Sequence, residues 1–460
     1  MKKRDKNREI DLRQGSILKA LTKLALPITA AAFVRMAYNF VDMLFIGRLG
    51  EGPMAAVGTA GMYLWLSEGI LMFSRMGGQV LTGQRLGADD REGARQTATS
   101  SFQLTFILGL VYSIILILGR KPLIGFFNLE NASTIQQAET YLTITAIGIV
   151  FAFVSGMSNS LITAAGNSML PFKITTIGLV INMVLDPILI FGWGPIPALG
   201  VAGAAWATMT AMAIESIMLT TAVLRRPLFK NLPLLNFDGF TDRARPIIRL
   251  GVPTALQQMG FTGISMIIAR LVAGFGESAI AAQKVGSQVE AISWMTADGF
   301  ANALRAFISQ NYGAGLYDRA RNGFRKAFIL MILIGVANTA ILYFLAEPLF
   351  GIFLDEAGVL FEGTRYLQIL AVSQVFMCME IIVAAAFNGF GETVIPSTVL
   401  LVGTVARIPM AYGLSSTALG VTGIWWAITL SSVFKGIIIY LIFLSYEKKK
   451  LHPAGGMTAN

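Results

Sequence analysis

Apolar stretches long enough to cross a lipid bilayer dominate this chain. Hydrophobic residues make up 55% of its 460 residues and charged residues only 13%, with a mean hydropathy of +0.65. A spanning helix needs about 20 mostly apolar residues. Inside hydrocarbon, every backbone polar group must find its partner within the protein, which favours helices. The sequence therefore predicts an all-α polytopic membrane protein.

Twelve transmembrane helices are predicted, six in each half of the chain. The segments are residues 24–47, 54–74, 98–119, 140–164, 171–192, 201–224, 247–272, 279–301, 325–346, 364–388, 396–414 and 421–445. The predicted domains are a cytoplasmic N-terminal tail (1–23), an N-lobe (24–224), a cytoplasmic linker (225–246), a C-lobe (247–446) and a cytoplasmic C-terminal tail (447–460).

The two halves repeat one another. Pro27 and Gly50 recur 226 residues later as Pro253 and Gly276, and the segment ALGVAGAAWA at 198–207 recurs as ALGVTGIWWA at 418–427. Six helices per half is an even number, so the halves have the same orientation in the membrane and form a parallel internal repeat. Two such lobes are typical of an alternating-access transporter.

Positive charge is distributed very unevenly between the two predicted sides. The inner side holds 25 Lys and Arg residues when both termini are cytoplasmic, and the outer loops hold four. Cytoplasmic loops are enriched in these residues, so the bias predicts the orientation and accounts for the net charge of +10. Nucleic-acid binding is not expected. The N-terminus is too polar for a signal peptide.

Acidic and polar residues recur at one depth in the first half. Asp42 and Asp186 each lie six residues from the outer end of a predicted helix, roughly 9 Å deep, and Thr208 lies at roughly 10 Å. Asn182 precedes Asp186 by four residues, which puts both on one helix face. Pro187 cannot donate a backbone hydrogen bond and frees a carbonyl oxygen nearby.

These groups suit a proton or a hard cation such as sodium. Two carboxylates brought close cannot comfortably both be ionised, so the pair would hold a proton or a cation. The alternative is that Asp42 and Asp186 pair separately with basic groups, for example Arg35 with Asp42. An ionisable residue inside a membrane is a functional hypothesis by default.

The second half lacks the same cluster. Ile268, Arg407 and Ala411 stand where the repeat would place Asp42, Asn182 and Asp186. Glu290, near mid-membrane, is a possible second-lobe site. Asp298 and Arg305, seven residues apart, are predicted to form a structural ion pair.

No enzymatic motif emerges from the sequence. It has no phosphate-binding loop, no HExxH and no Asp-rich magnesium motif, so neither an enzyme nor a resident metal or other cofactor is expected. The single cysteine, Cys378, and the single histidine, His452, exclude a disulfide framework and a histidine metal site.

From Gly15 to Tyr446 the chain resembles the MATE family, the multidrug and toxic compound extrusion transporters, and most of all its DNA-damage-inducible protein F (DinF) branch. The segments that carry the resemblance are LALPITAAAFVRMAYNFVDMLFIGRLG, GQRLGADD, SQNYGAG and NMVLDPILIFGWGPIPALGVAGAAWAT.

The resemblance implies export of small organic, often cationic or amphipathic, compounds by antiport against protons or sodium, with protons favoured. It assigns ion coupling to Asp42, Asn182, Asp186 and Thr208, which are also the ligands of any bound sodium. It assigns substrate binding to Tyr38, Asn39, Asp42 and Asn159. It further implies a monomer in the cytoplasmic membrane of a prokaryote.

Three other functions remain open from the sequence. A flippase for lipid-linked oligosaccharides should have a large basic cavity, and a membrane enzyme acting on lipids should have paired acidic motifs in cytoplasmic loops. The third alternative is a receptor or assembly protein, and this function would not explain why acidic residues recur at one depth.

Overall fold

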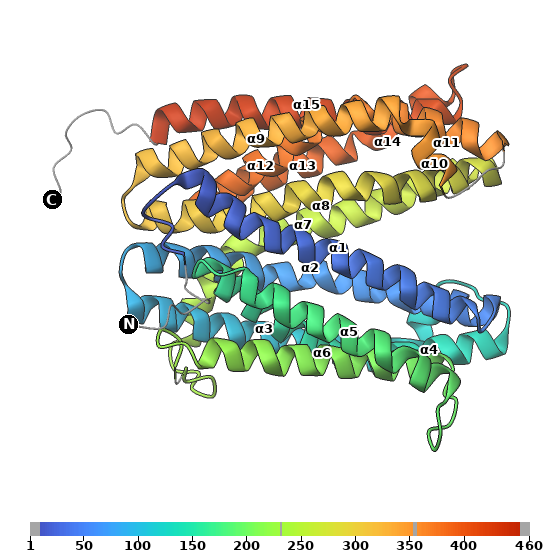
Figure 1. The fold of residues 1–460 in the computed structure, drawn as a ribbon, viewed down its shortest axis with the longest axis horizontal. Helices are drawn as coiled ribbons and strands as arrows, with labels where there is room; N and C mark the ends of the chain where they lie inside the picture. Colours follow the sequence, from blue (N-terminus) through green and yellow to red (C-terminus); the bar gives the residue numbers. More distant parts are fainter. Residues whose placement is uncertain (1–9, 231, 353–356, 451–460) are drawn as a thin grey trace, which may run out of the picture. The chain divides into compact units, whose positions relative to one another are not determined.

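A computed structural model of the chain describes residues 10–230, 232–352 and 357–450 (Figure 1). Within these ranges the secondary structure is helical, apart from one isolated bridge between Trp193 and Ile196. The predicted all-α fold is confirmed. Parts of the two predicted tails, and His452 with them, lie outside the described residues.

The helices of the first half are α1 (Ile17–Gly47), α2 (Glu51–Gly87), α3 (Arg91–Gly125), α4 (Ala132–Ala164), α5 (Met169–Phe191) and α6 (Val201–Leu224). Those of the second half are α7 (Phe240–Ala273), α8 (Glu277–Gly313), α9 (Tyr317–Phe344), α10 (Ala346–Gly351), α11 (Ala357–Ala371), α12 (Gln374–Phe390), α13 (Val394–Val405), α14 (Arg407–Ser415) and α15 (Val421–Lys450).

Each of the twelve predicted segments coincides with a helix or with a broken pair of helices. In the described part of the chain, ten helical segments are long and apolar enough to cross a membrane, and α11 with α12 makes an eleventh that bends by 50°. The twelfth, α8, carries charged residues such as Lys284 and Glu290 along its length. The described helices therefore fit two six-helix lobes.

Several helices extend well beyond the predicted segments. α2 ends at Gly87 rather than near residue 74, and α8 ends at Gly313 rather than near 301. Hydropathy identifies only the part of a helix that lies in hydrocarbon, whereas the backbone hydrogen bonds continue past it. Past the end of α2, the Asp90 carboxylate accepts bonds from Arg85 (2.5 Å) and from the backbone of Gly93 at the start of α3 (2.8 Å), and these bonds lower the pKa of Asp90.

The chain divides into two compact units. The first comprises residues up to Leu12 together with 26–255, and the second comprises 13–25 and 256–460, so α1 and α7 each contribute to both. The segment after α6 packs on the first unit: Phe229 is fully buried, and Gln103 donates to the carbonyls of Leu234 (3.1 Å) and Asn236 (2.7 Å). The predicted boundaries of lobes and linker stay a prediction.

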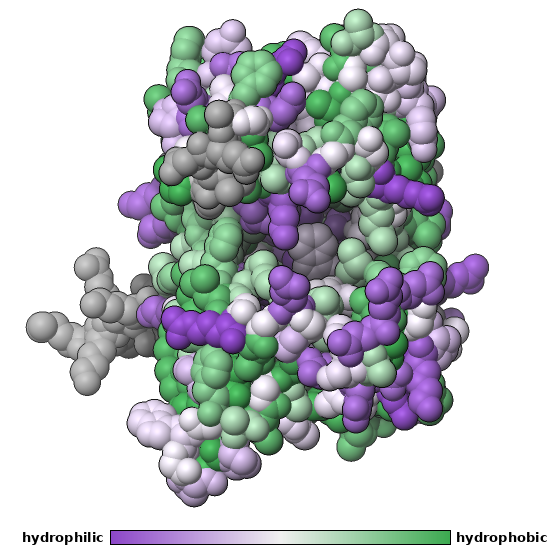
Figure 2. Space-filling model, turned by 90° about the vertical axis from the view of Figure 1, so that its right-hand side faces the viewer, coloured by the Kyte–Doolittle hydropathy of each residue, from purple (hydrophilic) through white to green (hydrophobic). Residues whose placement is uncertain are grey.

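Each unit has its own apolar core. In the first unit α4 packs against α2, α3 and α6, with Phe153 fully buried. In the second unit the buried Trp425 meets Tyr366 edge-on, with ring centroids 4.8 Å apart. Many outward-facing side chains along the helices are apolar, and Figure 2, which looks onto helix ends, shows hydrophilic residues gathered there among hydrophobic ones.

The repeated ALGV segments have the same structural role in both units. Gly200 and Gly420 precede α6 and α15 with φ of 56° and 55°, a conformation that favours glycine. A methyl group at Gly203 would overlap the Leu189 carbonyl of α5, and one at Gly423 would overlap the Leu414 carbonyl of α14. The repeat therefore preserves a close approach between two helices.

We expect Gly203→Ala to destabilise the protein by about 1–3 kcal/mol, because the new methyl group overpacks the contact between α5 and α6. The measurement is the melting temperature in detergent. Gly58→Ala is the control, since a methyl group there has no neighbour within 4 Å. Equal melting temperatures for the two variants would contradict the close approach.

Candidate functional site

The polar residues predicted at one depth meet in a single cluster of the first unit. α5 supplies Asn182 and Asp186, which lie one turn apart on its buried face and are 3% and 0% exposed. α1 supplies Tyr38 and Asp42, which also lie four residues apart and are partly buried. The same spacing of four therefore turns a pair of side chains from each helix toward the other.

Asn182 connects Tyr38 with Asp186. In the amide orientation that satisfies both neighbours, its oxygen accepts from the Tyr38 hydroxyl at 2.7 Å, and its nitrogen donates to the two Asp186 oxygens at 3.0 and 3.2 Å. These bonds hold the carboxylate of Asp186 in one orientation.

The carboxyl groups of Asp42 and Asp186 lie close enough to influence each other's charge. The buried Oδ1 atom of Asp42 has no hydrogen-bond donor among the described residues. Nor does any described Lys or Arg lie within 4.0 Å of either acid, so the separate ion pairs considered above, including Arg35 with Asp42, do not form. A shared proton or a bound cation would satisfy this pair.

Thr208 and a residue that the sequence analysis missed complete the cluster. The Thr208 hydroxyl on α6 lies close to the phenols of Tyr38 and Tyr141. Tyr141, 5% exposed, comes from α4. Hydropathy placed it at the very edge of the predicted segment 140–164, but α4 begins at Ala132, which carries Tyr141 about two turns further in.

Two residues assigned to substrate binding lie apart from this cluster. Asn39 is exposed on α1. Asn159 lies 18 residues beyond Tyr141 on α4, roughly 27 Å along the helix axis, and accepts from the Thr163 hydroxyl at 3.3 Å. Their predicted roles stay predictions.

The second unit contains a different polar network. Glu290 on α8 accepts from Gln374 at 3.4 Å and lies close to Tyr366 and Arg407. Arg407 donates to Ser431 at 3.0 Å. The sequence analysis named Glu290 and Arg407 but did not predict that they lie close together.

Bases balance the acids of this second network. The amino group of Lys435 on α15 lies 3.1 Å from Glu380 on α12, and both side chains are buried. Glu380 also lies close enough to Arg407 for their opposite charges to attract. The ion pair predicted between Asp298 and Arg305 is not direct: Asn302 lies between them and bonds to Asp298 at 3.1 Å and to Arg305 at 2.9 Å.

The carboxyl pair is therefore distinctive because it lacks a base. No group of three or more His, Cys, Asp or Glu suited to a metal occurs among the described residues. The oxygen atoms of this cluster come from the predicted set, Asp42, Asn182, Asp186 and Thr208, and from the phenols of Tyr38 and Tyr141. A surface groove of about 570 Å³ runs along the opposite face of α5, lined by apolar residues such as Met183 and Phe191, and includes none of them.

A duplicated helical fold with a polar site inside one lobe defines the class of alternating-access membrane transporters. The sequence model of the MatE family matches residues 27–188 and 253–413, one match in each half of the chain. The chain belongs to the MatE family, and it is a multi-pass membrane transporter rather than an enzyme.

Individual relatives cover nearly the whole chain. A probable multidrug resistance protein NorM from Thermotoga maritima is 26% identical over 436 residues, 94% of each chain. An FAD transporter from Shewanella oneidensis is 23% identical over 431 residues, 94% of this chain and 95% of its own. A mutant of the Vibrio cholerae MATE transporter VcmN has the same fold, with a TM-score of 0.87 and 22% identity over 95% of this chain and 98% of its own.

We expect Asn182→Ala to destabilise the protein by about 1–3 kcal/mol, because Tyr38 and Asp186 both lose a buried hydrogen-bond partner. The matched control is Asn39→Ala, which removes an exposed amide next to Tyr38 on α1. The readout is the melting temperature in detergent at neutral pH. An equal effect of both variants would argue against the role of Asn182 as a connector.

Proposed function

We propose that this chain exports organic, often cationic, compounds across the cytoplasmic membrane of a prokaryote in exchange for an inward-moving cation. It acts as a monomer with both termini in the cytoplasm. The observation that carries the proposal is the adjacent pair Asp42 and Asp186, which has an unsatisfied oxygen and no basic partner. Names of relatives such as the NorM proteins support a drug as the exported compound.

The mechanism is competition for the carboxyl pair. A cationic substrate favours the ionised pair, whereas a proton from outside removes the charge that holds the substrate. Binding of one therefore releases the other, as linkage requires when two ligands favour different states. Asn182, Tyr38 and Thr208 keep the acids oriented in both states.

We favour the proton over sodium as the coupling ion. Two carboxyl groups that lie close together can share a proton without any further ligand. Sodium would need several oxygen ligands at once. Beside the two acids the cluster offers neutral oxygens, and that of Asn182 already accepts a hydrogen bond from Tyr38. Coupling through the first lobe is favoured because the second-lobe acids, Glu290 included, have basic neighbours.

The related FAD transporter and the flippase alternative both concern anionic cargo, which calls for basic groups around the cavity. In the first-unit cluster the ionisable groups are acids and phenols. Such groups favour a cation over an anion as the transported substrate.

The test is uptake of a fluorescent organic cation into inverted vesicles. Transport should follow an imposed proton gradient and should be absent in Asp42→Asn. Transport driven by sodium alone would be consistent with the carboxyl pair as the coupling site, but it would show that the coupling ion is sodium rather than the proton. No transport under either gradient by folded, inserted protein would overturn the proposal in favour of a flippase.

The two acids should act as one unit. We expect Asp42→Asn and Asp186→Asn each to lower gradient-driven transport at least about tenfold, and the double variant to be hardly worse than either, because residues that share one proton are not additive. Glu68→Gln is the control, since Glu68 pairs with Arg75 at 3.8 Å, outside the cluster. If the fold-loss of transport in the double variant equals the product of the two single losses, the two acids act independently.

Substrate binding should also release protons without any gradient. When an organic cation is added to purified protein in weak buffer near neutral pH, a pH-sensitive dye should report about one proton per bound cation, because the substrate displaces the shared proton. Asp42→Asn should bind without release. Release that is unchanged in this variant would place the exchanged proton on another group.

A further inference from the structure

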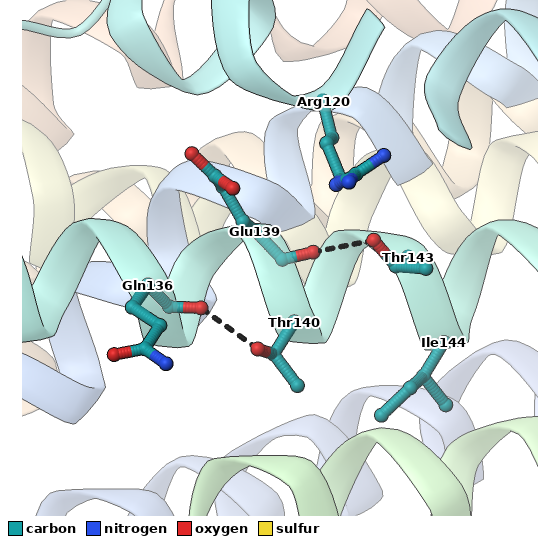
Figure 3. A pocket seen from close by; sticks show the side chains of 6 residues that line it. All are labelled: Arg120, Gln136, Glu139, Thr140, Thr143 and Ile144. Atoms are coloured by element: carbon teal, nitrogen blue, oxygen red, sulfur yellow. Dashed lines mark hydrogen bonds between the residues drawn. The ribbon is translucent and has the colours of Figure 1, made fainter. Parts of the chain in front are cut away.

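A second polar site lies on the first unit, where α3 ends and α4 begins. A groove of about 220 Å³ lies between them, and Figure 3 shows the side chains that line it. Its lining residues are Arg120, Gln136, Glu139, Thr140, Thr143 and Ile144. The mechanism proposed above uses none of them.

The groove contains one base and one acid that do not pair. The Arg120 guanidinium donates to its own helix, at the carbonyl of Ile117 (2.9 Å), and no described carboxylate lies within 4.0 Å of it. The Glu139 carboxylate has no hydrogen-bond or ion-pair partner among the described residues. In Figure 3 the two charged groups point away from each other. They can therefore bind two opposite charges of one ligand.

Two hydroxyl groups line the same groove. Thr140 donates to the carbonyl of Gln136 at 2.8 Å, and Thr143 donates to the carbonyl of Glu139 at 2.7 Å, as the dashed lines in Figure 3 show. Each hydroxyl proton is thus used within α4. The oxygens remain free to accept a bond from a ligand.

Apolar, exposed side chains lead up to the groove along α3. Phe106 and Leu110 are 49% and 43% exposed and lie within a quarter turn of Arg120 around α3, so they share its side of the helix. On α4 the residues Gln136, Thr140 and Ile147, also on one face, change from polar to apolar along the helix. Polar groups above an apolar exposed surface are typical of the level of lipid headgroups.

We propose that this groove binds the headgroup of a phospholipid that carries a primary amine. The phosphate lies against Arg120, and the ammonium group donates to Glu139 and to the threonine oxygens. The acyl chains follow the apolar face of α3. Charge-assisted hydrogen bonds of this kind are stronger than neutral ones and give the site its preference.

The chemistry distinguishes this ligand from similar ones. Phosphatidylcholine has the same charges, but its three methyl groups remove every N–H donor that Glu139 and the threonines would bind. Phosphatidylglycerol has no cation for Glu139. Free phosphoethanolamine has the right headgroup but buries no acyl chain on α3.

The experiment is a lipid competition with the purified full-length chain. Delipidated protein in detergent receives equal amounts of phosphatidylethanolamine, phosphatidylcholine and phosphatidylglycerol, and native mass spectrometry counts the retained lipids. We expect about a tenfold preference for phosphatidylethanolamine over phosphatidylcholine, the effect of losing one charged hydrogen bond. Because this comparison uses the parent protein, it does not depend on the folding of any variant.

Variants then locate the preference. Glu139→Gln should abolish the discrimination between the two zwitterionic lipids, and Arg120→Gln should weaken retention of all three. The matched controls are Lys121→Gln and Glu130→Gln, exposed neighbours outside the groove, which should behave like the parent.

Three results would overturn the proposal. Equal retention of all lipids by the parent protein would show that the groove has no headgroup preference. A preference that survives both groove variants would assign it to another surface. Displacement of the bound lipid by millimolar phosphoethanolamine would show that the groove binds a soluble zwitterion and that α3 contributes nothing.

Discussion

The cost of a buried charge without a partner governs how this protein uses its polar residues. The second unit meets that cost by neutralisation, since Glu380 has Lys435 as its partner at 3.1 Å and Glu290 lies near Arg407. The first unit places two acids side by side and supplies no base. Such a pair needs a positive charge from outside the protein, and this need is what an exchanger can use. The same physical cost thus leads to a charge-balanced network in one unit and, in the function proposed above, to an exchangeable site in the other.

The duplication explains why both solutions coexist in one chain. Features that depend on backbone geometry are kept in both halves: Gly200 and Gly420 have nearly equal positive φ, and Gly203 and Gly423 allow the same close approach of helices. The polar side chains of the two networks are not kept. Arg407, the counterpart of Asn182, lies just after the break between α13 and α14, whereas α5 continues unbroken through Pro187. The two halves therefore share the same helix packing at these glycines, whereas the polar side chains inside each lobe differ.

Much of the fold and part of the site could be predicted from the sequence. Hydropathy located every spanning segment, because apolar length is a direct requirement of the bilayer, and the spacing of four residues identified the shared face of Asn182 and Asp186. Tyr141 was not predicted as a site residue because hydropathy does not detect the polar first turns of α4. The contact between Asp42 and Asp186, like the meeting of Glu290 with Arg407, depends on how different helices pack, and no periodicity along a single helix contains that information. Asn302, which separates Asp298 from Arg305, is likewise visible only in three dimensions.

One turn of α4 faces two environments. Tyr141 lies near the carboxyl pair and Thr208, while Glu139, two residues earlier, lines the groove near the end of α3. A helix turn is stiff, so a displacement of this turn moves both side chains together. If the groove binds lipid and the carboxyl pair binds the coupling ion, as proposed above, the chemical makeup of the surrounding bilayer and the occupancy of the ion site are linked variables. Rates measured in vesicles made from different lipids would describe different states of the transporter rather than one intrinsic constant.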